Sequence, residues 1–437
     1  MEKILQYAWK WRLYGGEDQT LVDGRKVRIL DPGVLNTADG PDFSNAKIRI
    51  GDCVWAGNVE LHMRASDWWR HGHHLDEAYS SIILHVVAVD DARLTDSAGN
   101  EVPQLLFPLS PEICELYARL SVDASTPPPV RCWHKLHDMP QLLLSDAVRS
   151  AAYARLSSKA DHILDNMQAL GGDMAHACIA AVARALGFGA NSEIFEQVGM
   201  KLDLNHCARH ADDQLQLDAL VFGTAGLLSG VAPQHDDYFD ALYSEFGFLA
   251  HKYCIRPLPM SAWKRSGMRP ANFPHRRLAY LARLIPGATS LLSRIKECGS
   301  DVEALCALFA MRFDGYWANH YSFGASSPRD TSEAMSESSL RLILINAVAP
   351  MLFASGVSTD KSELMETAVD MLEGLPPENN TYIRDWSRAG IKADSAFTSQ
   401  GLLHIRKCYC ERNECLRCRI GNRLMRQQAL PSLPVMP

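Results

Sequence analysis

Alternating apolar and polar residues predict a β-hairpin between positions 40 and 63 of the chain. Apolar side chains occupy every second position on both sides of Gly51-Asp52, and this period of two is typical of strands with one buried face. A two-residue turn at Gly51-Asp52 places Ile50 opposite Cys53 and so fixes the pairing of the two strands.

Further segments surround the hairpin and predict a core with the order α-β-β-β-α-β. An amphipathic helix and a short β-branched strand precede the hairpin, and a capped helix and a strand that is apolar on both faces follow it. These four elements cover residues 1–14, 26–30, 67–79 and 81–89. We therefore expect an α+β or α/β fold for an N-terminal domain of residues 1–125, with an edge strand near its end.

The pattern changes after the proline-rich connector TPPPV at residues 126–130. From there the chain is rich in Ala, Leu, Arg and Glu at helical spacing, which predicts an α-helical domain over residues 126–400. A cysteine-rich segment at residues 401–425 follows, and we expect the tail at residues 426–437 to be disordered.

The composition of the 437-residue chain is that of a globular protein, with a net charge of −7 at pH 7. This charge excludes a protein that is basic throughout, but it allows a local basic groove for nucleic acid. The N-terminus lacks a signal-peptide pattern and no apolar run approaches a membrane span, so we expect a cytoplasmic protein without a membrane partner. In that compartment the 12 cysteines stay reduced, and a tight cluster of them is expected to bind metal.

Three polar residues of the hairpin form the first candidate site. With the pairing set by the turn, Asp42 falls opposite Leu61 and beside Glu60 and His62, which share a face because they are two positions apart. Two carboxylates and a main-chain carbonyl suit a hard cation such as Mg²⁺ or Mn²⁺. The alternative is a hairpin whose polar residues are solvated.

This spacing resembles the PD-(D/E)XK nuclease superfamily, in which Pro-Asp opens one strand and Glu-x-Lys lies on the next. Pro41-Asp42 and Glu60-Leu61-His62 match the pattern, except that His62 stands where the superfamily has lysine. The resemblance implies a restriction-endonuclease-like core in which Asp42 and Glu60 hold the metal and His62 orients or deprotonates the attacking water. Histidine titrates near neutrality and can itself bind metal, so the substitution alters the expected chemistry.

The segment SDWWRHGHHLDEAY follows the hairpin and carries several histidines. In a continuous helix, His71 and His74 share one face, and His73 and Asp76 share another. Placed over the metal, His73 would be an extra ligand or a general base, whereas the alternative is a polar helix face. His85 lies inside an apolar strand, where we expect a hydrogen-bonded core histidine.

The segment WKRSGMRPANFPHRR at residues 263–277 combines basic and aromatic side chains. Its two prolines predict a structured loop that leads into a helix. Basic groups at a helix start are tolerated more readily beside an anion, and arginines next to aromatics suit phosphates and stacked bases. We therefore expect nucleic-acid contacts, against the alternative of a solvated basic loop, from Lys264, Arg269, Arg276 and Arg277.

Four cysteines near the C-terminus have the spacing C-x-C-x₄-C-x₂-C, namely Cys408, Cys410, Cys415 and Cys418. Such a cluster suits Zn²⁺ or an iron–sulfur cluster. Cys408 and Cys410 need not both bind the metal, so Cys132 or His404 is a candidate to replace one of them. The set of one distant and three clustered cysteines resembles that of some helicase-associated nucleases. The alternative is a group of reduced thiols without metal.

The whole chain also resembles a bacterial family described only as a domain of unknown function, on stretches such as GPDFSNAKIRI, RPANFPHRRLA and CLRCRIG. Together, the residues and the resemblances predict a metal-dependent nuclease that hydrolyses phosphodiester bonds in DNA or RNA. One alternative is a catalytically inactive nucleic-acid-binding protein with the same fold, and another is a structural protein whose only metal is bound by the cysteines.

Overall fold

The chain folds into two units. The computed structural model describes residues 2–13, 18–36, 40–96, 99–107, 130, 132–228, 236–264, 267–324 and 326–429, and a few positions between 109 and 118. The sheet unit comprises residues 1–147, 388–390 and 405–437, and the helical unit comprises residues 148–387 and 391–404. The predicted connector before Val130 and the predicted tail beyond Ala429 lie outside the described residues.

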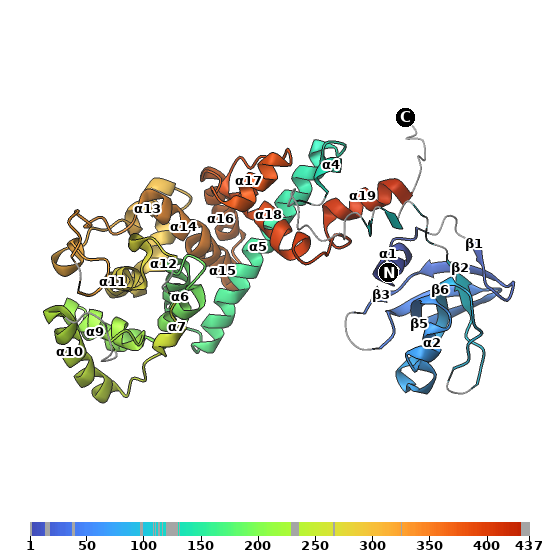
Figure 1. Ribbon diagram of the computed structural model, residues 1–437, viewed down its shortest axis with the longest axis horizontal. Coiled ribbons are helices and arrows are strands. Elements are labelled where there is room, and N and C mark those ends of the chain that lie inside the picture. The colour runs from blue at the N-terminus through green and yellow to red at the C-terminus, as the bar shows by residue number, and fades with distance from the viewer. Residues whose placement is uncertain are drawn as a thin grey trace. The chain divides into compact units, whose positions relative to one another are not determined.

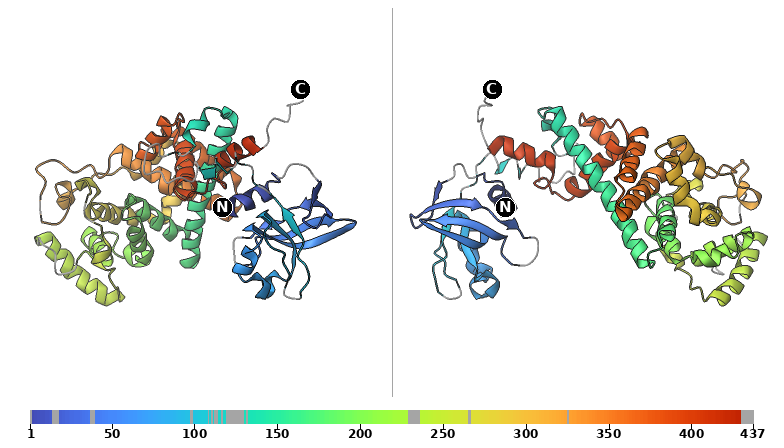
Figure 2. Two further views of the ribbon diagram at one scale, coloured as in Figure 1. Left: turned by 45° about the vertical axis from the view of Figure 1, so that its right-hand side comes forward. Right: turned by 180° about the vertical axis from the view of Figure 1, so that it is seen from behind.

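A mixed seven-stranded sheet forms the core of the sheet unit (Figure 1). Its strands are β1 (Asp18–Thr20), β2 (Lys26–Asp31), β3 (Val34–Leu35), β4 (Phe43–Ile50), β5 (Cys53–Arg64), β6 (Ile82–Val89) and β7 (Gln104–Leu106). They follow the order β1-β2-β4-β5-β6-β7, with β3 paired to β4. β6 runs parallel to both β5 and β7, whereas the other pairs are antiparallel. The sheet is curled (Figure 2).

The hairpin of β4 and β5 contains a β-bulge that the sequence pattern does not reveal. Next to the turn the strands pair as predicted, and this register holds as far as Ala46, which lies opposite Gly57. Beyond that point the register shifts by one residue, so that Phe43 lies opposite Val59. Asn45, inside the bulge, has a left-handed φ of 56°.

The bulge corrects the predicted position of Asp42. In the unshifted register Asp42 lies opposite Leu61, and residues that lie opposite each other share a face of the sheet. That face is the apolar one, because Leu61 is part of the buried core. The shifted register instead brings Asp42 to Glu60, and the backbone N–H of Asp42 donates to Oε2 of Glu60 at 2.9 Å. The predicted pairing with Leu61 is therefore wrong, and the bulge is what brings the two acidic residues together.

Short helices cover both faces of the sheet. α1 (Glu2–Lys10) packs on one face, where Leu5, Ala8 and Trp9 belong to the same buried core as the apolar residues of β4, β5 and β6. The other face carries the roof segment, which consists of α2 (Asp67–Arg70) and the 3₁₀ turns η1 (His73–Leu75) and η2 (Glu77–Tyr79). We predicted one helix over residues 67–79, but Gly72 has φ 76° and interrupts it.

Among the described residues, the sheet unit also contains α4 (Trp133–Leu136), the π-helical turn η8 (Ile405–Cys410) and α19 (Arg419–Ala429). The hydroxyl group of Tyr7 in α1 donates to the backbone carbonyl of Asn422 in α19 at 2.9 Å. This bond links the first and last helices of the chain within the sheet unit. The first residues of the predicted tail, up to Ala429, are helical.

The mainly α-helical fold predicted after residue 126 is confirmed (Figure 1). The helices are α5 (Gln141–Ala169), α6 (Met174–Leu186), α7 (Ser192–Lys201), α8 (Leu204–Ala208), α9 (Gln214–Thr224), α10 (Asp237–Tyr253), α11 (Pro274–Leu284), α12 (Ala288–Cys298), α13 (Val302–Phe309), α14 (Glu337–Ile343), α15 (Ala349–Thr359), α16 (Ser362–Gly374), α17 (Thr381–Arg388) and α18 (Ala396–His404). A π-helical turn, η7 (Leu344–Val348), joins α14 to α15.

The run formed by α14, η7 and α15 has 23 residues and is long and apolar enough to cross a membrane by length and composition alone. This differs from our expectation that no apolar run approaches such a length. However, 78% of the most apolar 18-residue stretch of this run is buried inside the fold. The burial shows that the run supplies core packing to the helical unit, which accounts for its apolar composition.

Candidate metal centre

Strand β5 carries two polar side chains into the interior of the sheet unit. Its alternation places Val59 and Leu61 in the core beneath α1 and turns Glu60 and His62 to the opposite face. Glu60 is 5% exposed and His62 is 2% exposed. The neighbouring strand adds His85, which is the register partner of Glu60 and is fully buried. Because polar groups are costly to bury alone, these side chains need partners.

The roof segment supplies two more histidines. His71 follows α2 and His73 begins η1, and the left-handed Gly72 lies between them. Both imidazole rings pack against His62, with ring centroids 4.9 Å away for His71 and 5.2 Å away for His73. His73 also stacks on Tyr79 with a centroid distance of 3.9 Å. The interruption of the predicted helix is therefore what directs two imidazoles toward one strand.

The ligand atoms of His62, His71 and His73 have the spacing of metal ligands, and Glu60 lies beside two of them. Oε1 of Glu60 lies 3.6 Å from Nε2 of His62 and 3.5 Å from Nε2 of His73, and Nε2 of His62 lies 3.1 Å from Nδ1 of His71. The ligand atoms of the three histidines all lie within 4.8 Å of one another. Ligands that share an ion through bonds of about 2.0–2.2 Å are about 3.0–3.5 Å apart, whereas a charge-assisted hydrogen bond measures about 2.7–2.9 Å.

Asp42 and Glu60 hold each other in place. The backbone N–H of Asp42 donates to Oε2 of Glu60, and the backbone N–H of Leu61 donates to Oδ2 of Asp42 at 3.1 Å. Gln6 of α1 donates from Nε2 to Oδ1 of Asp42 at 2.7 Å. These bonds leave Oε1 of Glu60 directed at the histidines. Asp42 is thus next to the cluster, as predicted, and orients Glu60; its role as a ligand stays a prediction.

Burial dominates the electrostatics of the cluster. It raises the pKa of Asp42 to about 6, and burial together with the nearby charge of Asp42 raises the pKa of Glu60 to about 8. Burial and the neighbouring histidines lower the pKa of His73 to about 4 and hold the pKa of His62 far below its ordinary value. Neutral imidazoles offer lone pairs to a metal, and a bound dication would compensate the two buried carboxylates.

His85 fixes the orientation of His62. Nδ1 of His62 lies 2.8 Å from Nε2 of His85, and a hydrogen bond donated by His62 here leaves its Nε2 lone pair toward the cluster. Metal-binding histidines commonly use their second nitrogen in this way. The expectation that His85 is a hydrogen-bonded core histidine is confirmed. Nδ1 of His85 and Nε1 of Trp68 are buried and have no hydrogen-bond partner among the residues that the structure describes.

Three imidazoles and one carboxylate suit Mn²⁺ or Zn²⁺ better than Mg²⁺, which takes oxygen ligands and retains water. Of the two metals expected here from the sequence, this donor set favours Mn²⁺ over Mg²⁺, and it adds Zn²⁺, which the sequence suggested only for the cysteines. The structure brings His62 and His73 together with Glu60 beside them and Asp42 bonded to Glu60, and it adds His71, which the assumed helix had grouped with His74. The pattern His71-x-His73 around a glycine was the signal that could have identified the additional ligand.

A basic patch that sequence reasoning missed lies on the same face of the sheet. Lys47 and Arg49 are exposed on β4, and their alternation with the core residues of β4 turns them to the face of Glu60. Arg28 of β2 lies opposite Arg49 and is held by Asp18, with Nε of Arg28 2.7 Å from Oδ1 of Asp18. The alternation of basic and apolar residues in the hairpin was the signal that could have identified this patch.

Two of the four basic residues predicted to contact nucleic acid are buried in the helical unit. Arg276 and Arg277 are each 2% exposed, so a phosphate cannot reach them. Their position follows from the start of α11 at Pro274, which turns both residues into the core. The prediction for these two arginines is wrong. Lys264 and Arg269 are exposed, and for them the predicted role stays a prediction.

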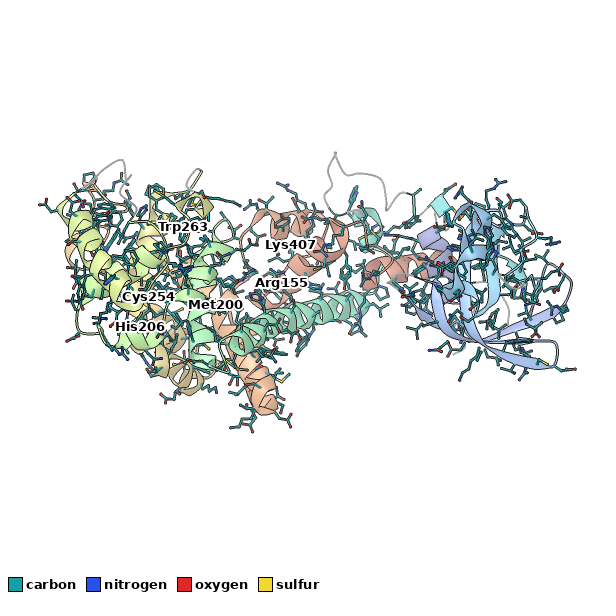
Figure 3. The ribbon with its side chains drawn as sticks, turned by 90° about the horizontal axis from the view of Figure 1, so that it is seen from below. Arg155, Met200, His206, Cys254, Trp263 and Lys407 are labelled. Atoms are coloured by element: carbon teal, nitrogen blue, oxygen red, sulfur yellow. The ribbon has the colours of Figure 1, made fainter. Side chains whose placement is uncertain are left out.

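The aromatic side chain at the start of this basic segment also lies in the interior. Trp263 is 6% exposed and its Nε1 donates to the backbone carbonyl of Ala225 at 2.8 Å. Figure 3 shows Trp263 within the helical unit, on the side where His206 and Cys254 are also labelled. Since its indole ring packs on Phe195, Trp263 is unavailable for stacking on a base.

A family model described as "Protein of unknown function (DUF2851)" matches residues 2–381, which is most of the chain. The chain belongs to this family. No curated protein and no solved structure matches the chain. All the residues of the candidate metal centre lie within the matched part of this DUF2851 protein, and Cys410, Cys415 and Cys418 lie after it.

Four of the five predicted cysteine ligands of the DUF2851 protein line one small void. They come from the start of α4, the end of η8 and the turn before α19, and they are Cys132, Cys410, Cys415 and Cys418. Cys408 is half-buried and is absent from the lining of this void, and His404 belongs to the helical unit. The geometry therefore favours Cys132 over Cys408 and His404 as the fourth member of the set.

Proposed function

We propose that the sheet unit of this DUF2851 protein is a metal-dependent hydrolase that cleaves phosphodiester bonds in DNA or RNA. The observation that carries this proposal is the spacing of ligand atoms in the group of His62, His71 and His73, with Oε1 of Glu60 beside two of them. The contact between Nε2 of His62 and Nδ1 of His71 is also a hydrogen bond, whereas the two distances from Oε1 of Glu60 exceed those of charge-assisted hydrogen bonds.

The chain supplies both the ligands and the groups that orient them. Mn²⁺ or Zn²⁺ would be held by Nε2 of His62, Nδ1 of His71, Nε2 of His73 and Oε1 of Glu60. When bound, the dication would supply Lewis acidity at a scissile phosphate. Asp42 restrains Glu60 through its backbone N–H, and His85 restrains His62 through its ring. Such restraint keeps the ligands in place before the metal and the substrate arrive.

The basic patch of β2 and β4 supports nucleic acid as the substrate class. Lys47 and Arg49 are exposed and spaced along one strand, and their face of the sheet continues to Glu60. Rows of Lys and Arg bind the repeated phosphates of a nucleic-acid backbone and release its counterions. A strand bound along β4 would therefore extend toward the cluster.

The order of the elements supports a nuclease-like fold. When the short strands β1 and β3 are left aside, α1, β2, the β4–β5 hairpin, the roof segment and β6 follow the order α-β-β-β-α-β, with β5 parallel to β6. We propose that this is a divergent PD-(D/E)XK core in which His62 replaces the lysine and the roof histidines add metal ligands. In this form of the core, Asp42 and Glu60 occupy the two acidic positions of the motif.

Glu60→Gln tests the proposal, because glutamine keeps the shape of the side chain and an oxygen for the N–H of Asp42 but loses the charge. Glu77→Gln on the exposed turn η2 is the matched control. With Mn²⁺ and labelled DNA and RNA oligonucleotides, the wild type and E77Q should cleave at equal rates. E60Q should be slower by more than about 100-fold, since even second-sphere partners of a metal contribute about 10–100-fold.

The inactive-binding alternative is favoured by one observation, namely that Glu60 and His62 are almost fully buried while Lys47 and Arg49 are exposed. Oligonucleotide binding by metal-loaded wild type without cleavage of any substrate would establish this alternative. Equal cleavage by E60Q and the wild type would show that the activity arises elsewhere. Either result would reject hydrolysis at the cluster.

A further inference from the structure

We propose that Cys132, Cys410, Cys415 and Cys418 hold an iron–sulfur cluster that joins the C-terminal segment to the start of α4. This site is independent of the proposed hydrolase. Three of the cysteines lie within nine positions of one another and the fourth is almost 280 positions earlier, yet all four line the same void. Each is at most 8% exposed, and none forms a disulfide.

Two backbone N–H groups face the sulfur of Cys418, where they oppose the rise in its pKa that burial causes. The backbone N–H groups of Ile420 and Gly421 donate to the sulfur of Cys418. Such N–H···S bonds stabilise a charged sulfur and need no side chain. Gly421 also packs directly on the turn, since a Cβ at this position would lie 2.2 Å from the carbonyl oxygen of Cys415. Only glycine allows this close approach of α19 to the cysteine turn.

The distances between the sulfurs distinguish an iron–sulfur cluster from a single zinc ion. Four sulfurs bonded to one Zn²⁺ at about 2.3 Å are about 3.8 Å apart. In the part of the chain that the structure describes, no three cysteine sulfurs lie within 4.8 Å of one another. A group larger than one ion, with several metal atoms that each bind a thiolate, meets this spacing.

The lining of the void suits such a cluster in polarity as well. Apart from the sulfurs, the side chains of Ile405 and Ile420 form its walls, with Tyr409 beside them. An apolar shell limits access of water to the metal–sulfur bonds and protects them. Cys408 lies two residues before Cys410 in η8 and does not line the void, so it provides an internal control.

The test is metal and sulfide analysis of the full-length protein purified without oxygen. The wild type should contain iron and acid-labile sulfide at near-stoichiometric level and show the broad brown absorption of a cluster. Cys408→Ala should contain as much iron and sulfide as the wild type. Cys132→Ala and Cys415→Ala should each retain less than one tenth of that iron. The loss in Cys132→Ala is the critical result, because this residue lies far from the others in sequence.

Instability of these variants does not prevent the test, because the wild type alone decides between the metals by its elemental content and its electron paramagnetic resonance after reduction. One zinc per chain without iron would overturn the cluster. Neither metal, with four freely reactive thiols, would also overturn it. A loss of iron in Cys408→Ala equal to that in Cys132→Ala would reject the assigned set of ligands.

Discussion

Replacement of Arg276 by alanine should unfold the helical unit at much lower denaturant concentration, although a surface arginine would tolerate the same change. The guanidinium group of Arg276 is buried and donates to four backbone carbonyls, those of Trp317, His320, Thr331 and Glu333. It also lies over the ring of Phe313, 4.6 Å from the ring centroid. The group therefore holds the irregular segment between α13 and α14 against α11.

The expected loss follows from these contacts. Each hydrogen bond to a charged group contributes about 1.5–3 kcal/mol, but the four bonds share one side chain and cannot be added as independent terms. Removal of one partner from a buried charged network costs about 3–5 kcal/mol, because the remaining polar groups stay buried without partners. We therefore expect Arg276→Ala to lose about 4 kcal/mol of unfolding free energy.

Urea unfolding followed by tryptophan fluorescence measures this loss. With a slope of about 3 kcal/mol per M, a loss of about 4 kcal/mol lowers the midpoint by about 1.3 M. Arg269→Ala, on the exposed part of the same segment, is the control and should change stability by less than about 0.5 kcal/mol. A midpoint for Arg276→Ala within about 0.3 M of the wild type, together with weaker binding to an oligonucleotide, would refute the structural role.

Two further predictions concern the hairpin. Asn45→Val should lose about 1–2 kcal/mol in the same urea assay, because a β-branched residue does not accept the positive φ of the bulge; an unchanged midpoint would show that the bulge is dispensable. Log affinity for DNA falls as log salt rises, and the double variant Lys47→Glu and Arg49→Glu should make this fall shallower by about 2 units of slope, one for each lost phosphate contact. An unchanged salt slope would remove the basic patch from the binding surface, and equal metal content in both proteins is the control.

The sequence predicted most elements of the sheet unit because local patterns determine them. The period of two in β4 and β5 and the apolar run in β6 predicted the strands, and the turn at Gly51-Asp52 predicted the register beside it. The bulge at Asn45 could not be predicted in the same way, since one unpaired residue leaves no periodic signal. Its consequence is large, because it decides which face of the sheet Asp42 occupies.

The sequence predicted the strand residues of the candidate site, but its prediction of the residues from the roof segment was incomplete. Glu60 and His62 share a face by alternation, whatever the tertiary structure. The contribution of His71 depends on Gly72, whose left-handed conformation ends α2 early and cannot be read from helical spacing. Arg276 shows the opposite error: a basic residue at a helix start suggested an anion, but in the structure backbone carbonyls accept its hydrogen bonds.

The central claim is that Glu60 and three histidines bind one metal ion, and a crystal structure of the protein with Mn²⁺, read by anomalous scattering, tests it most directly. The account predicts one peak within about 2.0–2.3 Å of Oε1 of Glu60, Nε2 of His62, Nδ1 of His71 and Nε2 of His73. The peak should persist in His74→Ala and disappear in His71→Ala. An absence of manganese from these four residues at saturating concentration, or manganese bound only at another place in the molecule, would contradict the claim.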